Sequence, residues 1–190
     1  MVSTTHERSE ENPIEKMVTS VYPSFALLAG MQLDLFTPLK DGPMNAEKIA
    51  ASIGVRSAKL KPLLYALVVA GFLNVQGELF SNTDSANRYL VKSSPSCVGD
   101  IHELLSTMWS AALKTAESIR TGTPQAKLNY SEMSIDGLRQ FFRGEHPYAV
   151  QYGRDIVERY DFSKYSTLLD VGGGSGWLAI AVNEACLNIQ

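Results

Sequence analysis

The sequence predicts a mainly α-helical chain that ends in the first strand, turn and helix of an α/β domain. Apolar residues recur at helical spacing over much of residues 13–160, with a hairpin pattern at 72–81. Near the end, the apolar run Thr167 to Val171 stops at a glycine cluster, and an apolar segment at helical spacing, Trp177 to Leu187, follows. Strand, glycine turn and helix in this order are typical of the opening unit of a doubly wound sheet.

Composition narrows the class of protein. The 190 residues are 45% hydrophobic and 19% charged, which are ordinary values for a globular chain with a core. The net charge of −3 argues against a dedicated binder of nucleic acid or of anionic membranes. Cys97 and Cys186 lie far apart without metal-ligand spacing, so we expect a reducing, cytoplasmic location and no metal site. No stretch resembles a signal peptide or a membrane span.

The chain begins with a polar tail, residues 1–12, which we expect to be disordered. Residues 13–35 then place apolar side chains at helical spacing, and Pro23 is expected to kink or divide the segment into two helices. The segment is apolar on most sides, which predicts that it is buried on most sides. The partner that we expect to bury it is a second copy of the chain.

Two further helices are predicted next. Asn45 can cap a short helix from Ala46 to Ile53, which stops at Gly54. Ser57 can cap a longer helix that runs to Ala70. Pro62 lies inside that second helix, so regular hydrogen bonding is expected to start later than Ser57 implies.

A hairpin follows these helices, because two short apolar runs flank Gln76-Gly77-Glu78. Two helices and a β-wing in this order predict a winged helix. A winged helix raises the alternative of a DNA-binding regulator. Its second helix offers only Lys59 and Lys61 at its start and then mostly apolar residues, which is poor chemistry for reading bases.

The middle of the chain is predicted to be helical. Ile101 to Ile119 reads as one long helix with an apolar inward face, which Thr121-Gly-Thr-Pro124 ends. Ile135 to Phe142 and Tyr148 to Tyr160 read as two further helices that lead into the glycine strand. A polar connector, residues 161–166, joins the last of them to Thr167.

The spacing of the glycines indicates which ligand the turn could hold. A dinucleotide fingerprint that starts at Gly172 would put Trp177 at its third position, where a small residue is needed. A start at Gly174 reaches Ala179 but lies beyond the end of the strand, and the Gly-Lys-Ser/Thr of a P-loop is absent. The remaining pattern is an acid, Asp170, followed by alternate glycines. A glycine turn without any ligand stays an alternative.

The string Leu-Leu-Asp170-Val-Gly-Gly-Gly-Ser-Gly176 resembles the first motif of class I S-adenosylmethionine-dependent methyltransferases. It looks most like the small-molecule O-methyltransferases that include plant phenolic, acetylserotonin and bacterial polyketide enzymes. Those enzymes carry an N-terminal dimerisation region built on a winged helix. The residues that follow its order here are Gly42-Pro43, Ile49-Ala50, Gly54, Leu60 to Leu67, Gly71 and Phe80. The resemblance runs from about Pro13 to the end and departs at Lys61-Pro62, where the family more often has arginine-rich helix chemistry.

The resemblance implies a site for S-adenosylmethionine. The glycine turn would cradle the methionine part of the cofactor, and Asp170 would lie beside its ammonium group, although a structural acid that bonds turn N–H groups is the alternative. The implied cofactor-binding residues are Asp170, Gly172, Gly173, Gly174, Gly176, Phe142 and Tyr152. Met108 and Trp109 would line the substrate pocket. Plain core packing is slightly favoured for Met108 and Trp109. Packing against the α/β layer explains Phe142 and Tyr152 equally well.

No catalytic residue is assigned. The family's ribose-binding acid and catalytic histidine are expected beyond Gln190, and Glu184 comes too early for the first of these roles. The three histidines precede the glycine fold and are expected to be surface or satisfied side chains; they are His6, His102 and His146.

We therefore expect four segments: a tail at 1–12, a winged-helix dimerisation domain at 13–95, a helical connector and substrate lid at 96–160, and an incomplete Rossmann-like methyltransferase domain at 161–190. The predicted function is the N-terminal portion of an S-adenosylmethionine-dependent O-methyltransferase. It would act as a homodimer on a small hydroxylated, aromatic molecule, and this chain alone is predicted to be inactive. The alternatives are a non-catalytic dimerisation module of the same family and, more distantly, the DNA-binding regulator.

Overall fold

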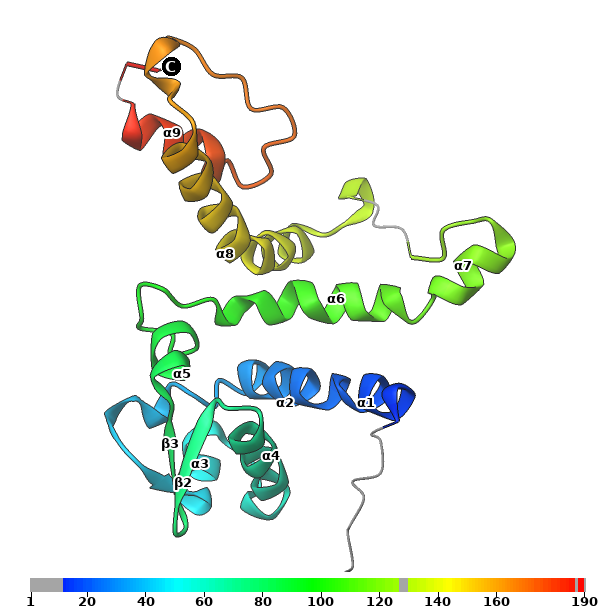
Figure 1. The fold of residues 1–190 in the computed structure, drawn as a ribbon, viewed down its shortest axis with the longest axis vertical. Helices are drawn as coiled ribbons and strands as arrows, with labels where there is room; N and C mark the ends of the chain where they lie inside the picture. The colour runs from blue at the N-terminus through cyan, green and yellow to red at the C-terminus, as the bar shows by residue number, and fades with distance from the viewer. Residues whose placement is uncertain (1–11, 127–129, 187, 190) are drawn as a thin grey trace, which may run out of the picture. The chain divides into compact units, whose positions relative to one another are not determined.

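The computed structural model describes residues 12–126, 130–186 and 188–189, and its chain divides into two compact units at Asn87/Arg88 (Figure 1). The described part is mostly helical and carries one small three-stranded sheet, which agrees with the predicted mainly α class. The two units are described separately.

The first unit opens with two helices, α1 (Pro13–Thr19) and α2 (Val21–Gln32). The predicted division of this segment is confirmed, but it falls at Ser20 rather than at the proline. Pro23 lies in the first turn of α2, where its missing N–H has no partner to lose. The side chain of Asn12 caps α1 by accepting a hydrogen bond from the backbone N–H of Ile14 at 3.0 Å.

The next helices are α3 (Ala46–Ile53) and α4 (Ser57–Val69). The cap predicted for α3 is confirmed, since the Asn45 side chain accepts from the backbone of the helix at 2.9 Å. Ser57 does not cap α4: Arg56 occupies that position and makes no side-chain cap. Nor does Pro62 delay the helix, because the N–H of Lys59 already donates to the Arg56 carbonyl at 3.1 Å. A proline removes one hydrogen bond, and the packed neighbours hold the rest.

The predicted hairpin is confirmed as β2 (Leu73–Gln76) and β3 (Leu79–Asn82). A short strand that the sequence did not reveal, β1 (Met44–Asn45), pairs antiparallel with β3, so the sheet order is β1-β3-β2. Phe80 lies opposite both Met44 and Val75.

The core of the first unit lies where α2, α3, α4 and the sheet converge. Its fully buried large side chains are Leu35, Phe36, Leu39, Ile49, Leu64, Leu67, Leu73 and Phe80. Gly30 of α2 allows this packing, since a Cβ there would lie 3.0 Å from the Phe36 ring and 3.3 Å from Leu67. The short 3-10 helix η1 (Pro38–Asp41) covers the sheet, and α5 (Asp84–Tyr89) spans the division between the units.

The second unit begins its main helices with α6 (His102–Ala112) and α7 (Thr115–Thr121), preceded by a 3-10 turn, η2 (Gly99–Ile101). The single helix predicted over this region is wrong. The chain breaks at Leu113, which is 87% exposed, and the Thr115 hydroxyl donates to the Ala112 carbonyl at 2.7 Å. The predicted inward face of α6 holds no buried residue. The predicted stop is confirmed, because Gly122 ends α7 with a φ of +66°.

A single 25-residue helix, α8 (Ile135–Arg159), replaces the two helices predicted there. It continues through Pro147 and changes direction along its length (Figure 1). Before it lies the 3-10 turn η3 (Tyr130–Glu132). The two-helix prediction failed because a proline inside a helix usually ends it, whereas here the lost bond is tolerated.

The last segment holds the 3-10 turn η4 (Phe162–Lys164) and helix α9 (Trp177–Ala185). The strand predicted at Thr167–Val171 is absent, since these residues pair with no other strand and Leu169 and Val171 are 85% and 84% exposed. A lone extended segment is not a strand until a neighbour takes its backbone hydrogen bonds. Of the second strand predicted at 187–190, Leu187 and Gln190 lie outside the described residues, and Asn188 and Ile189 form no strand.

Candidate cofactor site at the glycine turn

The glycine turn has the backbone that its sequence predicts. Gly172, Gly174 and Gly176 have φ values of +76°, +56° and +76°, a region that side chains other than glycine rarely adopt. The N–H of Gly176 donates to the carbonyl of Gly173 at 2.7 Å, which closes the turn immediately before α9. The alternate glycines are therefore required by backbone conformation.

Gly173 is required for a different reason. Its φ is ordinary, but a Cβ there would lie 2.5 Å from the Asp170 carboxyl carbon, so the carboxylate rests directly on the glycine backbone. One carboxylate oxygen, Oδ2, is buried and has no hydrogen-bond partner in the described part of the chain. A buried acceptor without a partner is costly, which indicates a place for a donor that the chain itself does not supply.

Helix α8 forms the opposite wall of the site, and a glycine sets the distance. A Cβ at Gly153 would lie 3.0 Å from the carbonyl oxygen of Trp177 and 3.2 Å from Ala181, so α8 and α9 touch at this glycine. The contact places Tyr152 beside the turn. The resulting pocket has a volume of about 200 Å³. Its lining is Glu145, Ala149, Tyr152, Gly153, Ile156, Asp170, Gly172, Gly173, Gly174, Ser175, Trp177 and Leu178.

Glu145 is a site residue that the sequence reasoning missed. Its carboxylate oxygen lies 3.4 Å from the Cβ position of Gly174, and it lines the same pocket as Asp170. The signal that could have found it is the helical spacing of Glu145, Ala149 and Tyr152 on one face. That signal was hidden because the prediction divided the helix around Pro147.

The other residues predicted to bind the cofactor do not all line the same pocket. Tyr152 lines the 200 Å³ pocket with Asp170 and the first three glycines, whereas Gly176 does not. Phe142 lies next to the turn, with a ring carbon 3.8 Å from the Cβ position of Gly174, but it lines a neighbouring larger pocket. The structure thus brings most of the predicted residues together in one place.

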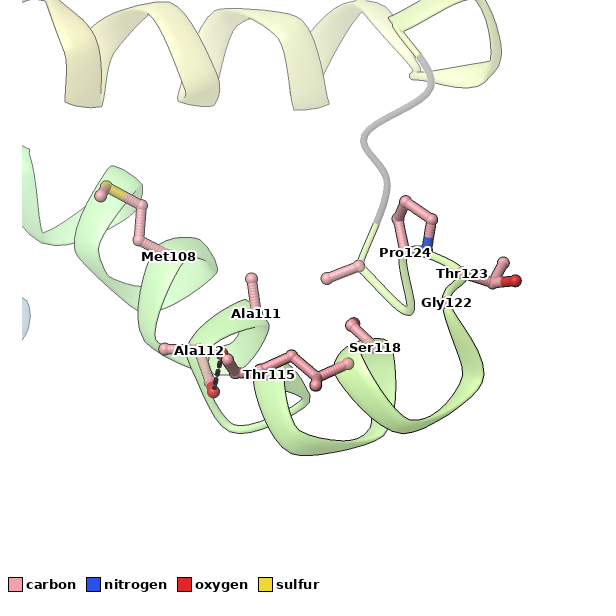
Figure 2. A pocket seen from close by; sticks show the side chains of 10 residues that line it. Met108, Ala111, Ala112, Thr115, Ser118, Gly122, Thr123 and Pro124 are labelled. Carbon is pink, nitrogen blue, oxygen red and sulfur yellow. Dashed lines mark hydrogen bonds between the residues drawn. The ribbon is translucent and has the colours of Figure 1, made fainter.

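Of the two residues predicted to line the substrate pocket, only Met108 lines a pocket near the end of α6. Met108 lines a pocket of about 560 Å³ between α6, α7 and residues 122–126, as Figure 2 shows, and Trp109 does not line it. Met108 is 53% exposed, so it is not a core side chain within the described residues. None of the residues that line this pocket lines the pocket at the glycine turn.

His146, which the sequence left unassigned, forms a specific contact. Its Nδ1 accepts a hydrogen bond from the indole Nε1–H of Trp177 at 2.5 Å, and the two rings meet edge-on with centroids 4.9 Å apart. His102 is the first residue of α6, and His6 lies outside the described residues. Neither of the two described histidines, His102 and His146, has a hydrogen bond that would pair it with a nucleophile.

Two ionisable side chains of the connector, residues 161–166, have shifted pKa values. Hydrogen bonds from the Ser163 hydroxyl and backbone N–H lower the pKa of Asp161 below its ordinary value. The Tyr165 hydroxyl lies 2.7 Å from that of Tyr160, and this hydrogen bond raises the pKa of Tyr165. Both groups are in the connector and neither lines the pocket at the turn.

Two features are absent from the described ranges, 12–126, 130–186 and 188–189. No helix there is both long and apolar enough to span a bilayer. No cluster of three or more histidine, cysteine, aspartate or glutamate side chains is arranged there to hold a metal ion.

Comparison with known proteins gives a consistent result. The family model for the O-methyltransferase dimerisation domain matches residues 16–92. A tetracenomycin polyketide synthesis 8-O-methyl transferase from Streptomyces glaucescens is 28% identical over 193 residues, which cover 97% of this chain and 56% of that protein. An acetylserotonin O-methyltransferase from Gallus gallus is 30% identical over 152 residues, 72% of this chain and 44% of that protein.

Solved structures share the fold. Human N-acetylserotonin methyltransferase, solved in complex with SAM, matches with a TM-score of 0.81 and 21% identity, over 96% of this chain and 59% of that chain. PigF, solved with SAH, matches with a TM-score of 0.77 and 22% identity, over 94% and 57%. The chain spans about half the length of the curated relatives it matches. Residues 16–92 are an O-methyltransferase dimerisation domain, and the chain as a whole is similar to S-adenosylmethionine-dependent O-methyltransferases.

Proposed function

We propose that this chain is the dimerising and cofactor-binding part of an enzyme that transfers a methyl group from S-adenosylmethionine to a hydroxyl of a small aromatic molecule. The dimerisation domain and the similarity to known methyltransferases support the reaction class, and the relatives named above include a polyketide O-methyltransferase and an acetylserotonin O-methyltransferase. The observation that carries the proposal is the pocket of Asp170 and Glu145 at the glycine turn.

The charge of that pocket fits the cofactor. S-adenosylmethionine carries a positive sulfonium and, on its methionine part, an ammonium group. Asp170 and Glu145 are the charged side chains that line the pocket, and both are acids. Carboxylates accept hydrogen bonds from an ammonium group and attract both positive charges, and the Tyr152 ring adds a face that favours a cation. An acid-lined pocket would repel a dinucleotide phosphate.

The shape of the turn fits as well. The buried Oδ2 of Asp170 lacks a donor, and glycines leave the backbone open to a ligand at the place where a side chain would fill the space. The pocket of about 200 Å³ is smaller than the roughly 300–1,000 Å³ of sites that enclose a whole small molecule. We infer that the turn holds the methionine part of the cofactor, which supplies the methyl group, and that this chain alone binds the cofactor weakly and is inactive.

We also propose that the chain contains a winged helix and the first Rossmann-like unit, and that it forms a homodimer. Helices α3 and α4 followed by the hairpin have the order of a winged helix, and the turn with α9 has the order of the first Rossmann-like unit. The apolar side chains exposed on α1 and α2 fall at positions i, i+3, i+4, i+7, i+8 and i+11, which form one stripe. This apolar stripe consists of Ile14, Met17, Val18, Val21, Tyr22 and Phe25. We propose that a second copy of the chain covers it.

Saturation-transfer NMR on the 190-residue chain tests the cofactor site, because that method detects weak binding. In the wild type we expect saturation transfer from the protein to the methionine protons of S-adenosylmethionine. We expect this signal to be lost in Asp170→Asn and in Glu145→Gln. The matched control is Glu158→Gln, an exposed acid on α8 outside the pocket. Equal transfer in all variants, or none in the wild type, would refute the site. Micromolar affinity by calorimetry would contradict weak binding.

A second candidate function is that of a dimerisation module without catalysis. The observation in its favour is that the apolar stripe belongs to a unit with a buried core of its own. Dimerisation without any saturation transfer to the cofactor would favour this candidate. The DNA-binding alternative has less support, since Lys61, one of its two candidate lysines, lies 3.9 Å from the carboxylate of Glu47.

A further inference from the structure

A second, larger pocket lies beside the glycine turn. It has a volume of about 970 Å³, enough for a whole small molecule with two or three rings. One wall is a face of α8 that includes Phe142 and His146, and the other is the segment between Lys92 and Asp100. All of these residues belong to the second unit.

This pocket adjoins the proposed cofactor site through Ser175. Ser175 lines both the 970 Å³ pocket and the 200 Å³ pocket, and its buried hydroxyl has no hydrogen-bond partner in the described part of the chain. Phe142 lines the larger pocket and its ring lies 3.8 Å from the Cβ position of Gly174. A molecule in the larger pocket would therefore lie against the turn. The 560 Å³ pocket at Met108 shares no lining residue with the turn.

The two adjoining pockets have opposite charge. The 200 Å³ pocket is lined by acids, whereas the larger one is lined by Lys92, Arg139 and Arg143 against a single acid, Asp100. Arg139 is already paired with Asp136 at 3.1 Å. Arg143 makes no ion pair with the described residues, so its guanidinium is the cation best placed to receive an anion.

His146 adds a donor to the same pocket. Its Nδ1 accepts the hydrogen bond of the Trp177 indole, so the ring nitrogen that carries the proton is Nε2. The Nε2–H can therefore donate a hydrogen bond to a ligand in the pocket. Together with the Phe142 ring, these groups offer an aromatic surface, a cation and N–H donors.

We propose that the 970 Å³ pocket binds the methyl acceptor, and that the acceptor is an aromatic carboxylate whose negative charge is held by Arg143. The inference rests on the proposed function for its choice of ligand, but not for the existence of the anion site. Within the anion site, Arg143 determines the specificity for a carboxylate. The opposite charges of the two pockets allow a cationic cofactor and an anionic acceptor to bind side by side.

The test uses a matched pair of probes, 2-naphthoate and its neutral isostere 2-naphthamide, titrated into the 190-residue chain without cofactor. Quenching of tryptophan fluorescence reports binding, because Trp177 is hydrogen-bonded to a residue of the pocket. We expect naphthoate to bind about tenfold more tightly than naphthamide, and a salt increase to weaken naphthoate alone.

The variants assign the effect to one side chain. We expect Arg143→Gln to weaken naphthoate about tenfold and to leave naphthamide unchanged, while Arg143→Lys keeps most of the affinity. Arg154→Gln removes the same charge from an exposed position of α8 outside the pocket and should change nothing. Circular dichroism confirms that each variant is folded.

The outcomes separate this inference from the proposed function. Equal affinity for the two probes, no binding of either, or equal loss in Arg143→Gln and Arg154→Gln would overturn the anion site. Each result holds whether or not S-adenosylmethionine binds, since the cofactor test uses Asp170 and Glu145. Naphthoate binding that follows Arg143 would uphold the anion site even if the cofactor test fails.

Discussion

The Trp177 indole N–H donates a hydrogen bond of 2.5 Å to Nδ1 of His146, and this contact joins the first residue of α9 to the middle of α8. The two rings line adjoining pockets: Trp177 lines the pocket of about 200 Å³ at the glycine turn, and His146 lines the pocket of about 970 Å³ beside it. The large residue that argued against a dinucleotide fingerprint thus joins α9 to α8 next to the glycine turn.

Replacing His146, the acceptor of this hydrogen bond, should change the NMR signals of the donor, the Trp177 indole N–H. In His146→Leu the Trp177 indole N–H loses its partner, whereas Gln in the same place can still accept. We expect the indole ¹H and ¹⁵N resonances of Trp177 to move in His146→Leu, with a loss of about 1 kcal/mol in the free energy of unfolding. His146→Gln should lie between that variant and the wild type. An indole resonance that is the same in all three proteins would contradict the contact.

The close packing of α8 on α9 predicts the effect of one methyl group. Gly153→Ala would place a Cβ 3.0 Å from the backbone carbonyl of Trp177, so the two helices must separate. We expect this variant to lower the free energy of unfolding by about 1–3 kcal/mol in urea denaturation followed by circular dichroism. In contrast, Gly137→Ala would meet only the side chains of Ser134 and Met133, at 3.3 Å and 3.6 Å.

Gly137→Ala therefore serves as the control for the helix propensity of alanine. Alanine favours a helix over glycine by about 1 kcal/mol, so this variant should be neutral or more stable than the wild type. Equal effects of the two substitutions would show that α8 and α9 are not in close contact at Gly153.

The apolar stripe predicts a dimer that a single charge can disrupt. Met17 belongs to the stripe and is 74% exposed, and a glutamate buried in its place would lack any partner. We expect size-exclusion chromatography with light scattering to give a dimer for the wild type and a monomer for Met17→Glu. Val69 is also exposed, at 86%, but lies on α4 outside the stripe, so Val69→Glu should remain a dimer. A monomeric wild type would end this proposal.

The connector before the turn predicts a pH effect with a definite sign. Hydrogen bonds from the Ser163 hydroxyl and N–H, followed by the nearby Lys164 ammonium, hold the pKa of Asp161 below 3.8. A lowered pKa in the fold means that Asp161 contributes stability above its ordinary pKa and loses that contribution as the pH falls through the folded value. We expect Ser163→Ala to raise the pKa of Asp161 toward 3.8, as read from its carboxyl ¹³C shift.

Lys164→Gln is the comparison, since the charge of Lys164 is a smaller cause than the Ser163 hydrogen bonds. Its Nζ lies 3.7 Å from the carboxylate in an exposed pair, where water and salt screen the attraction. The order of effects should be Ser163→Ala above Lys164→Gln, and the reverse order would show that charge dominates.

Local chemistry made parts of the fold predictable. The cap at Asn45, the stop at Gly54, the hairpin at Gly77 and the glycine turn all rest on residues whose own preferences determine the backbone. The predictions that failed concern continuity, as at Pro147, where one helix replaces two, and at Leu113, where one helix becomes two. The spacing of apolar residues indicates which face of a helix is apolar. It does not show whether the helix continues past a residue where a backbone hydrogen bond is lost.

By itself, the sequence determined the alternate glycines of the turn, the acid that precedes them and the apolar character of residues 13–35. Only the tertiary structure brought Glu145 to the same pocket as Asp170, paired Trp177 with His146 and placed Ser175 between two pockets of opposite charge. The physical reason is that backbone conformation depends on neighbouring residues. The surroundings of a side chain depend on how closely helices such as α8 and α9 approach, which Gly153 allows.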